Sequence, residues 1–229
     1  MKCLFMFLGM LFILTGTVYA NEIDNNILIE KSSLTKYESS AREASVRVVT
    51  QGGMGSGIYV TINKKNVVLT AAHVVDNFTT VSVIGRNDES VAGSVVYIDI
   101  DNDFAIISLP QMTTRNPVKF IQSKSDLKDL IGEDITYTGF PNGHDLFTIR
   151  GSIAGIEKGY LVLQSYAWMG ASGSGVFNSK GEIVGILVAV DAVRFDRSRH
   201  IVESMVWIIP IKNMEMRFVE SVLSNLHVK

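Results

Sequence analysis

Short apolar runs rich in β-branched residues alternate with Gly, Asn and Asp turns from about Val46 onward, a pattern typical of β-strands. A first series of such runs covers 46–49, 57–62, 67–71, 81–84 and 91–98. After a looser stretch near 111–128, a second series covers 134–138, 146–156, 160–164, 173–177, 183–190 and 204–210. Two groups of about five or six strands joined by a linker predict two antiparallel barrels or a sandwich.

Both ends of this β-region have helical spacing. Ahead of it, Leu34, Tyr37 and Ala41 fit a modest helix within a polar and charged segment. Behind it, apolar residues recur every four positions after Pro210, with Val219 and Leu223 alongside. The members of this row are Met214, Phe218, Val222 and Leu226. We expect a terminal helix that packs one apolar face on the body of the protein.

The first twenty residues have the pattern of a signal peptide. Lys2 gives a positive start, 4–14 is an apolar run, and Val18-Tyr19-Ala20 offers small residues where a signal peptidase cleaves. The alternative is an uncleaved membrane anchor, since 3–20 is almost long enough to span a bilayer. In both cases the folded part is expected outside the cytoplasm, in the periplasm or the extracellular space.

These patterns predict a signal peptide at 1–20, a lead-in segment at 21–45, a first barrel at 46–115, a second barrel at 116–210 and a C-terminal helix at 211–229. The single cysteine, Cys3, lies in the leader, so we expect no disulfide, thiolate metal site or catalytic cysteine in the mature protein. Lys and Arg number 21 against 23 Asp and Glu, without a basic cluster, and nucleic acid is therefore not expected as a partner.

Acyl transfer without metal or thiol needs a hydroxyl nucleophile, a base, a group that orients the base, and backbone donors for the oxyanion. The candidate base is His73, which follows an apolar run and the small residues Ala71 and Ala72. Small alanines allow a tight turn and leave room beside the imidazole. A lone histidine after a strand also fits a purely structural role.

The candidate for the orienting carboxylate is Asp103, because it directly precedes an apolar strand and a buried carboxylate needs a partner such as an imidazole N–H. Asp99 and Asp101 are the alternatives, as solvated acids of the same turn. The acidic triplet lacks the glycine and the later glutamate of an EF-hand calcium loop. We therefore expect no metal and no cofactor.

The candidate nucleophile is Ser172, in the run Gly170-Ala171-Ser172-Gly173-Ser174. Glycines around a serine let the amides of Gly170 and Ser172 converge as an oxyanion hole, although a Ser/Gly cluster can also be a simple turn. The nucleophile elbow of α/β-hydrolases needs Gly-x-Ser-x-Gly and a histidine after the serine, which this run does not fit. The early glycines lack the Gly-Lys-Ser/Thr of a phosphate-binding loop.

The order His73, Asp103, Ser172 is the chymotrypsin order. Their flanking sequences resemble the signatures of trypsin-like serine proteases, most closely the HtrA/Deg-type and glutamyl-endopeptidase branches. Four further motifs resemble parts of the same fold: the turn that opens the first barrel at 53–57, a loop of the second at 139–143, a strand pair at 181–186 and the closing strand at 208–211. The resemblance implies an all-β fold of two six-stranded antiparallel Greek-key barrels, with Ser172 in the second and the other two residues in the first.

The resemblance also implies a serine endopeptidase that pairs an extended peptide with the strand around 186–190. The implied substrate-binding residues are Tyr166, Ala167, Trp168, Ile186, Leu187 and Val188. Because these walls are uncharged, we expect an apolar residue before the cut. Tyr166 and Trp168 could instead be core aromatics, and His144 and His200 are most simply surface residues.

Ser174 and Gly175 depart from the usual glycine and proline after the nucleophile, although Ser174 is similar to the glutamyl-endopeptidase pattern. The partners predicted are a peptide or protein substrate, with no membrane after removal of the leader. A catalytically silent trypsin-like domain that binds a peptide or protein is the alternative function, and an esterase using the same residues is a third.

Overall fold

The computed structural model describes residues 33–195 and 198–226. The predicted signal peptide, with Cys3 and the cleavage point after Ala20, lies outside the described residues. Residues 21–32 of the predicted lead-in segment also lie outside them, and so do 196–197 and 227–229.

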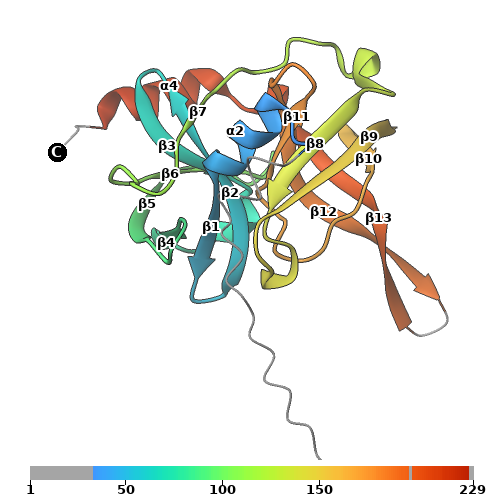
Figure 1. The fold of residues 1–229 in the computed structure, drawn as a ribbon, viewed down its shortest axis with the longest axis horizontal. Coiled ribbons are helices and arrows are strands. Elements are labelled where there is room, and N and C mark those ends of the chain that lie inside the picture. The colour runs from blue at the N-terminus through green and yellow to red at the C-terminus, as the bar shows by residue number, and fades with distance from the viewer. Residues whose placement is uncertain (1–32, 196–197, 227–229) are drawn as a thin grey trace, which may run out of the picture. The chain divides into compact units, whose positions relative to one another are not determined.

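The first series of strands closes into a barrel, drawn in blue and green in Figure 1. Its strands are β1 (Ser45–Thr50), β2 (Gly53–Ile62), β3 (Lys65–Thr70), β4 (Thr80–Ile84), β5 (Ser90–Asp99) and β6 (Phe104–Ser108). They follow the order β1-β4-β5-β6-β3-β2, and β1 pairs with β2 to close the ring. A short β7 (Val118–Lys119) adds to β2 in parallel.

The second series forms a closed barrel in the order β10-β13-β12-β11-β8-β9. Its strands are β8 (Asp134–Gly139), β9 (Phe147–Glu157), β10 (Tyr160–Gln164), β11 (Gly175–Asn178), β12 (Ile183–Phe195) and β13 (Ser198–Pro210). Strand pairings in both barrels are antiparallel apart from the addition of β7. The described part of the chain therefore confirms the predicted all-β fold of two six-stranded barrels.

Each barrel has its own core because alternate side chains of its strands point inward. In β1, for example, Val46 and Val48 are fully buried while Arg47 between them is half-buried. Tyr59 and Phe104 are among the largest buried side chains of the first core, and Tyr137 is among the largest of the second core. Burial of these β-branched and aromatic side chains removes apolar surface from water, and this stabilises both barrels.

The predicted N-terminal helix is confirmed as α2 (Lys36–Ala44). Its first turn is closed by a capping box in which Thr35 and Glu38 bond each other's backbone amides. Glu38 also pairs with Arg150 on β9, at 2.6 Å between Oε1 and Nε, and accepts a hydrogen bond from Thr136 on β8. The Arg150 guanidinium holds the pKa of Glu38 at about 2, so the carboxylate is ionised at neutral pH. Its ion pair with Arg150 therefore fixes α2 to the second barrel.

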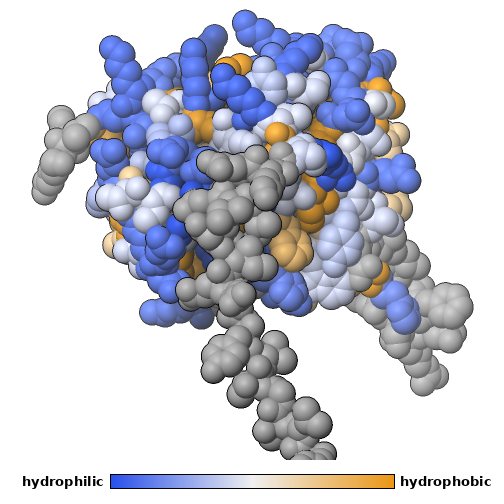
Figure 2. Space-filling model, in the orientation of Figure 1, coloured by the Kyte–Doolittle hydropathy of each residue, from blue (hydrophilic) through white to orange (hydrophobic). Residues whose placement is uncertain are grey.

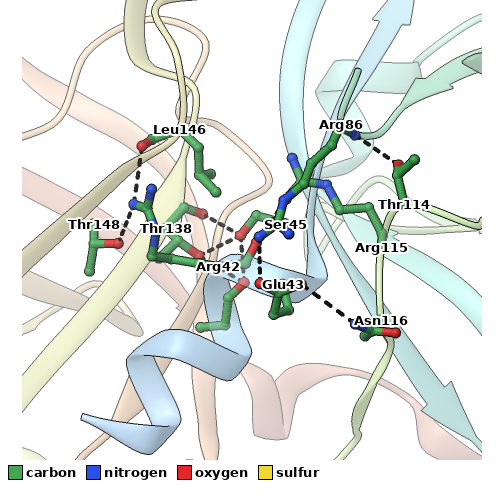
Figure 3. Close-up of polar contacts among 11 residues, drawn as sticks. Arg42, Glu43, Ser45, Arg86, Thr114, Arg115, Asn116, Thr138, Leu146 and Thr148 are labelled. Carbon is green, nitrogen blue, oxygen red and sulfur yellow. Dashed lines mark hydrogen bonds and ion pairs between the residues drawn. The ribbon is translucent and has the colours of Figure 1, made fainter. Parts of the chain in front are cut away.

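The C-terminal end of α2 lies between the two barrels (Figure 3). Arg42 donates from its guanidinium to the Thr148 hydroxyl of the second barrel at 2.8 Å. Its backbone carbonyl accepts from Arg115, in the segment after the first barrel, at 2.9 Å. The neighbouring Glu43 pairs with Arg86, which follows β4, at 2.5 Å. The helix therefore holds the two barrels together through polar contacts on both sides.

A further helix, α4 (Met216–Asn225), follows the second barrel and the short turn η3 (Ile211–Asn213). It returns to the first barrel, where Val219 and Leu223 are buried in the same cluster as the strands β2, β3 and β6. Phe218, which belonged to the predicted apolar row, is instead 65% exposed. The predicted helix is confirmed, and of its predicted apolar residues Val219 and Leu223 form the buried side.

The structure differs from the predicted strands at several places. The strand β6 is not among the five runs of the first series, although an apolar strand was expected after Asp103. Residues 53–57, which resemble a turn, already belong to β2 and pair with β1, so the turn is Gln51-Gly52. Strands β12 and β13 extend beyond the predicted 183–190 and 204–210 and pair as a hairpin out to Phe195 and Ser198. Two strands that pair mainly with each other need no alternating apolar face, and hydrophobic periodicity does not mark them.

A 3₁₀ turn, η1 (Leu127–Leu130), precedes β8, and a second 3₁₀ turn, η2 (Pro141–Gly143), follows it.

Figure 2 shows hydrophilic residues over much of the visible face, with hydrophobic residues in small separate areas. The helices of the described residues are all too short or too polar to cross a lipid bilayer.

Candidate active site

His73 lies in the short helix α3 (Ala72–Val75), which begins just after β3 ends. Ala71 and Ala72 are fully buried, and their small side chains let the chain turn from strand to helix against the core. The register of β3 and β6 pairs Thr70 with Ala105. Asp103 precedes Ala105 by two residues, so this pairing brings it beside His73.

Asp103 makes three hydrogen bonds to the start of α3. Its backbone carbonyl accepts from the Ala72 amide at 3.1 Å. Its carboxylate accepts from the His73 amide at 2.9 Å through Oδ1 and contacts the imidazole Nδ1 at 2.8 Å through Oδ2. The residue has φ of +50°, a left-handed conformation that Asp tolerates better than most residues.

This contact defines which imidazole nitrogen carries the hydrogen. An ionised carboxylate can only accept, so Nδ1 of His73 must be the donor. The other nitrogen, Nε2, is then an acceptor when the ring is neutral. The His73 side chain is 47% exposed, whereas that of Asp103 is 22% exposed. The arrangement therefore presents the imidazole of the candidate base to the solvent, with the candidate orienting carboxylate behind it.

The two alternative acids do not contact His73. Asp99 accepts from the backbone amide and the side-chain amide of Asn102, both at 3.0 Å, and so closes its own turn. Asp101 is exposed in the same turn. Of the three aspartates, the structure brings Asp103 alone to the imidazole.

Ser172 lies in the turn between β10 and β11. Its carbonyl accepts from the Ser56 amide of β2 at 2.7 Å, which joins the turn to the first barrel. Gly173 next to it has φ of +91° and donates to the Leu187 carbonyl at 2.8 Å. A Cβ on Gly173 would lie 2.0 Å from the Ser56 carbonyl oxygen, so glycine is required here on two grounds.

The peptide groups before Ser172 are oriented by bonds from outside the turn. The Met169 carbonyl accepts from the Asn142 amide at 2.5 Å, and the Gly170 carbonyl accepts from the Ser56 hydroxyl at 2.8 Å. Gly170 has φ of +92°. Within residues 33–195 and 198–226, the amides of Gly170 and Ser172 have no hydrogen-bond acceptor. Two neighbouring free amides are what an anion-binding hole requires.

His73, Gly170 and Ser172 line one cavity of about 300 Å³. Its other walls are mostly small or apolar, formed by Thr50, Gly52, Gly53, Met54, Val74, Phe78 and Met169. The structure therefore brings the predicted base, nucleophile and oxyanion donors to the same space. A larger cavity of about 490 Å³ lies elsewhere, between α2 and the strands β8 and β9, and contains none of these residues.

The Ser172 hydroxyl is directed to the Val188 carbonyl, which it approaches at 3.4 Å. Between the described side chains of His73 and Ser172 there is no hydrogen bond. A distance of 3.4 Å is at the weak end of the range, so little energy opposes rotation of the hydroxyl toward the imidazole.

The six implied substrate-binding residues have different environments. Ala167, Ile186 and Leu187 are buried in the cores, Val188 is 8% exposed, and Trp168 is half-buried. Tyr166 is exposed, and its carbonyl accepts from the buried Tyr137 hydroxyl. None of the six borders the cavity at His73. Their part in substrate preference stays a prediction.

Two further histidines among the described residues lie on the surface. His144 stacks on Phe147 with ring centroids 5.8 Å apart, next to the loop that holds Asn142. His200 is exposed on β13. Among the residues that the structure describes, no group of three His, Cys, Asp or Glu side chains could hold a metal ion.

Sequence reasoning missed Ser56, which contacts both the Gly170 carbonyl and the Ser172 carbonyl. The residue stands in the glycine-rich run 53–57, where it looks like a turn residue. Its one signal was a serine placed between two glycines at the start of an apolar strand, which says nothing about a contact more than a hundred residues away.

A family model described as a trypsin-like peptidase domain matches residues 55–186, more than half of the chain. The chain belongs to this family. Its trypsin-like domain includes His73, Asp103 and Ser172 within the matched range. The family resemblance seen in the sequence is thereby confirmed.

Curated relatives of this trypsin-like chain include a Synechocystis protein named as serine protease HhoA, 31% identical over 61% of the chain. A Staphylococcus aureus protein named serine protease HtrA-like is 24% identical over 86% of the chain. A Haemophilus influenzae relative, 26% identical over 60% of the chain, is named as a periplasmic serine protease of the do/HhoA-like kind. The chain spans only 38%, 27% and 31% of the lengths of these three proteins.

Solved structures support the fold. The serine endoprotease from Yersinia pestis matches with a TM-score of 0.62 and 22% identity over 85% of this chain and 69% of its own. An inactive form of Rv3671c from Mycobacterium tuberculosis also has a TM-score of 0.62, with 16% identity over 85% of this chain and 93% of its own. At these identities the likeness concerns the fold alone.

Proposed function

We propose that this trypsin-like chain is a serine endopeptidase that cleaves peptide bonds through an acyl-enzyme. The observation that carries the proposal is the contact of Nδ1 of His73 with the Asp103 carboxylate at 2.8 Å, in a site where His73 and Ser172 border one cavity. A base oriented in this way, next to a serine and free backbone amides, is the constellation that acyl transfer needs.

In the proposed reaction the Ser172 hydroxyl rotates from the Val188 carbonyl to Nε2 of His73 and attacks a peptide carbonyl. His73 takes the hydroxyl proton and passes it to the leaving amine, while Asp103 stabilises the imidazolium. The amides of Gly170 and Ser172 donate to the oxyanion. Water then attacks the acyl-enzyme by the same proton route in reverse and releases the second product.

Substitution Ser172→Ala tests this function directly. The purified wild-type protein is expected to hydrolyse fluorescein-labelled casein and to react with a fluorophosphonate probe, which labels only activated serines. The Ser172→Ala protein is expected to do neither and to keep the melting temperature of the wild type, because the hydroxyl makes only one weak contact. Hydrolysis by the purified variant close to the wild-type rate would refute the assignment of the nucleophile.

The proposed preference is for an uncharged, apolar residue before the cut. It is supported by the uncharged stretches 166–170 and 186–190, since an ion without a partner would lose its hydration there. Cleavage-site sequencing on a denatured protein mixture tests the preference. If Lys, Arg or Glu dominated before the cut, this part of the proposal would be wrong while the reaction itself would stand.

We further propose that the protein is exported and acts in the periplasm or outside the cell. The signal-peptide pattern at 1–20 supports this, as do relatives whose names describe them as periplasmic. N-terminal sequencing of the protein from fractionated cells tests it. An N-terminus at Asn21 in an exported fraction is expected, and an intact leader in the cytosol would contradict the proposal.

A catalytically silent domain that binds a peptide is the second candidate. It is favoured by one observation, the Ser172 hydroxyl bonded to the Val188 carbonyl in place of the imidazole. The fluorophosphonate probe separates the two functions, because a serine that does not transfer its proton to His73 remains unlabelled.

A further inference from the structure

We propose that Ser56, a buried serine of the first barrel, is the positioning residue that sets the proposed oxyanion turn of the second barrel. Ser56 lies on β2 and is fully buried. The inference rests on the proposed function, since it concerns how the amide of Gly170 is presented to a substrate.

The side chain of Ser56 uses both hydrogen-bonding capacities of its hydroxyl. It donates to the Gly170 carbonyl at 2.8 Å and accepts from the Phe140 amide at 3.0 Å. A hydroxyl has one hydrogen to donate and can accept as well, so both bonds form at once. One side chain therefore links the nucleophile turn to the loop that follows β8.

The backbone of Ser56 is fixed from both barrels at the same point. Its amide donates to the Ser172 carbonyl at 2.7 Å, and its carbonyl accepts from the Thr70 hydroxyl at 2.7 Å. Thr70 ends the strand that leads to His73. The Ser56 hydroxyl is thus held at a defined position relative to both the base and the nucleophile, as a positioning group must be.

The bonds around Gly170 determine where its amide points. In a trans peptide the C=O and N–H groups point in opposite directions. The Met169 carbonyl bonds to the Asn142 amide, so the Gly170 N–H of the same peptide points away from Asn142 and stays free. The next peptide is held through the Gly170 carbonyl by Ser56. Ser56 also holds Phe140, two residues before Asn142, so it supports both peptides that flank Gly170.

Gly170 needs such support because glycine rotates more freely than any other residue. Loss of the Ser56 hydroxyl would leave the Gly170 carbonyl and the Phe140 amide without their partners in a largely buried place. Both groups would gain by turning toward other partners or water. The Met169–Gly170 peptide can then rotate, and its amide no longer faces the substrate carbonyl.

The test compares Ser56→Ala with the wild-type protein in the full chain, using p-nitrophenyl butyrate as a small acyl substrate. Loss of one oxyanion donor typically lowers kcat by about 10²- to 10³-fold. For a donor that is misplaced only part of the time we expect kcat to fall about 10- to 100-fold, with KM changed less than about twofold. A kcat equal to that of the wild type in the folded variant would overturn the proposal.

Ser174→Ala is the matched control. Ser174 is also fully buried, and both hydroxyls lie close to Gly139, at 2.0 and 2.9 Å from where its Cβ would be. Among the described residues the Ser174 hydroxyl has no hydrogen-bond partner, and it has no part in the proposed reaction. Its removal is expected to leave kcat unchanged. A fall as large as that of Ser56→Ala would mean that any hole in this region slows the reaction, which would also overturn the proposal.

A thiol keeps about the same volume but is a weak donor, so Ser56→Cys gives the same comparison if Ser56→Ala does not fold. A crystal structure of the variant gives a readout that does not depend on activity. In this structure we expect a rotated Met169–Gly170 peptide. A turn unchanged from the wild type would overturn the proposal, whether or not the protein has measurable activity. Wild-type protein that neither cleaves casein nor reacts with the fluorophosphonate would refute the proposed function alone.

Discussion

The substitution Asp103→Asn is the sharpest test of the proposed base, because both carboxylate oxygens of Asp103 accept from His73. Oδ1 takes the backbone amide at 2.9 Å and Oδ2 takes the imidazole Nδ1 at 2.8 Å. An asparagine offers one acceptor oxygen and one donor nitrogen in the same volume. It can therefore replace only one of the two contacts.

If the amide oxygen keeps the backbone contact, the amide nitrogen faces Nδ1 and requires that nitrogen to accept. The ring hydrogen then moves to Nε2, where it blocks proton transfer from Ser172. A base held in this wrong tautomer lowers kcat about 10⁴-fold. Each factor of ten corresponds to about 1.4 kcal/mol, so the loss amounts to about 5 to 6 kcal/mol of transition-state stabilisation.

The assay is the initial rate of casein hydrolysis together with the rate of fluorophosphonate labelling, each per folded molecule. Asp101→Asn is the control, because Asp101 is exposed in the same turn and makes no contact with His73. It should keep the wild-type rate. If the Asp103→Asn protein stayed within about tenfold of the wild type, the carboxylate could not be what selects the tautomer.

Three further substitutions test the framework. Gly173→Ala would place a Cβ 2.0 Å from the Ser56 carbonyl oxygen at a positive φ, so we expect chemical denaturation to show a loss of at least about 2 kcal/mol. Leu223→Ala should cost about 2 to 5 kcal/mol by the same measurement, because this residue is 1% exposed in the first core; an unchanged midpoint would mean that α4 is dispensable. Glu38→Gln should cost about 1 to 3 kcal/mol at pH 7. The pKa of Glu38 is about 2 in the folded protein, against an ordinary 4.5. The loss of unfolding free energy caused by Glu38→Gln should therefore be constant above about pH 5, shrink as the pH falls from about 4.5 to about 2, and vanish near pH 2. A loss that melting curves show to be independent of pH would contradict this origin.

The strands of both barrels could be predicted from sequence because most of them bury one face, and burial leaves β-branched residues in short runs. The candidate base, acid and nucleophile could be predicted for a different reason. Each is flanked by an unusual set of residues, such as the alanines before His73 or the glycines around Ser172, and such short flanking patterns can be read directly from the sequence.

The contacts that join the barrels could not be predicted in this way. Ser56 bonds to Gly170 across 114 positions, and Arg42 bonds to Thr148 across 106, so no local pattern records either pair. The exposure of Phe218 on α4 could not be predicted for a related reason. Phe218 and Val219 are adjacent and both apolar, and only the shape of the first barrel determines which of them is buried.

The return of α4 to the first barrel has a consequence for how the molecule is made. A ribosome produces the strands of that barrel first, yet Val219 and Leu223, which are buried in the same cluster, emerge only after all the strands of the second barrel have been made. A nascent or prematurely terminated polypeptide therefore keeps an open hydrophobic surface that chaperones and degradation enzymes recognise.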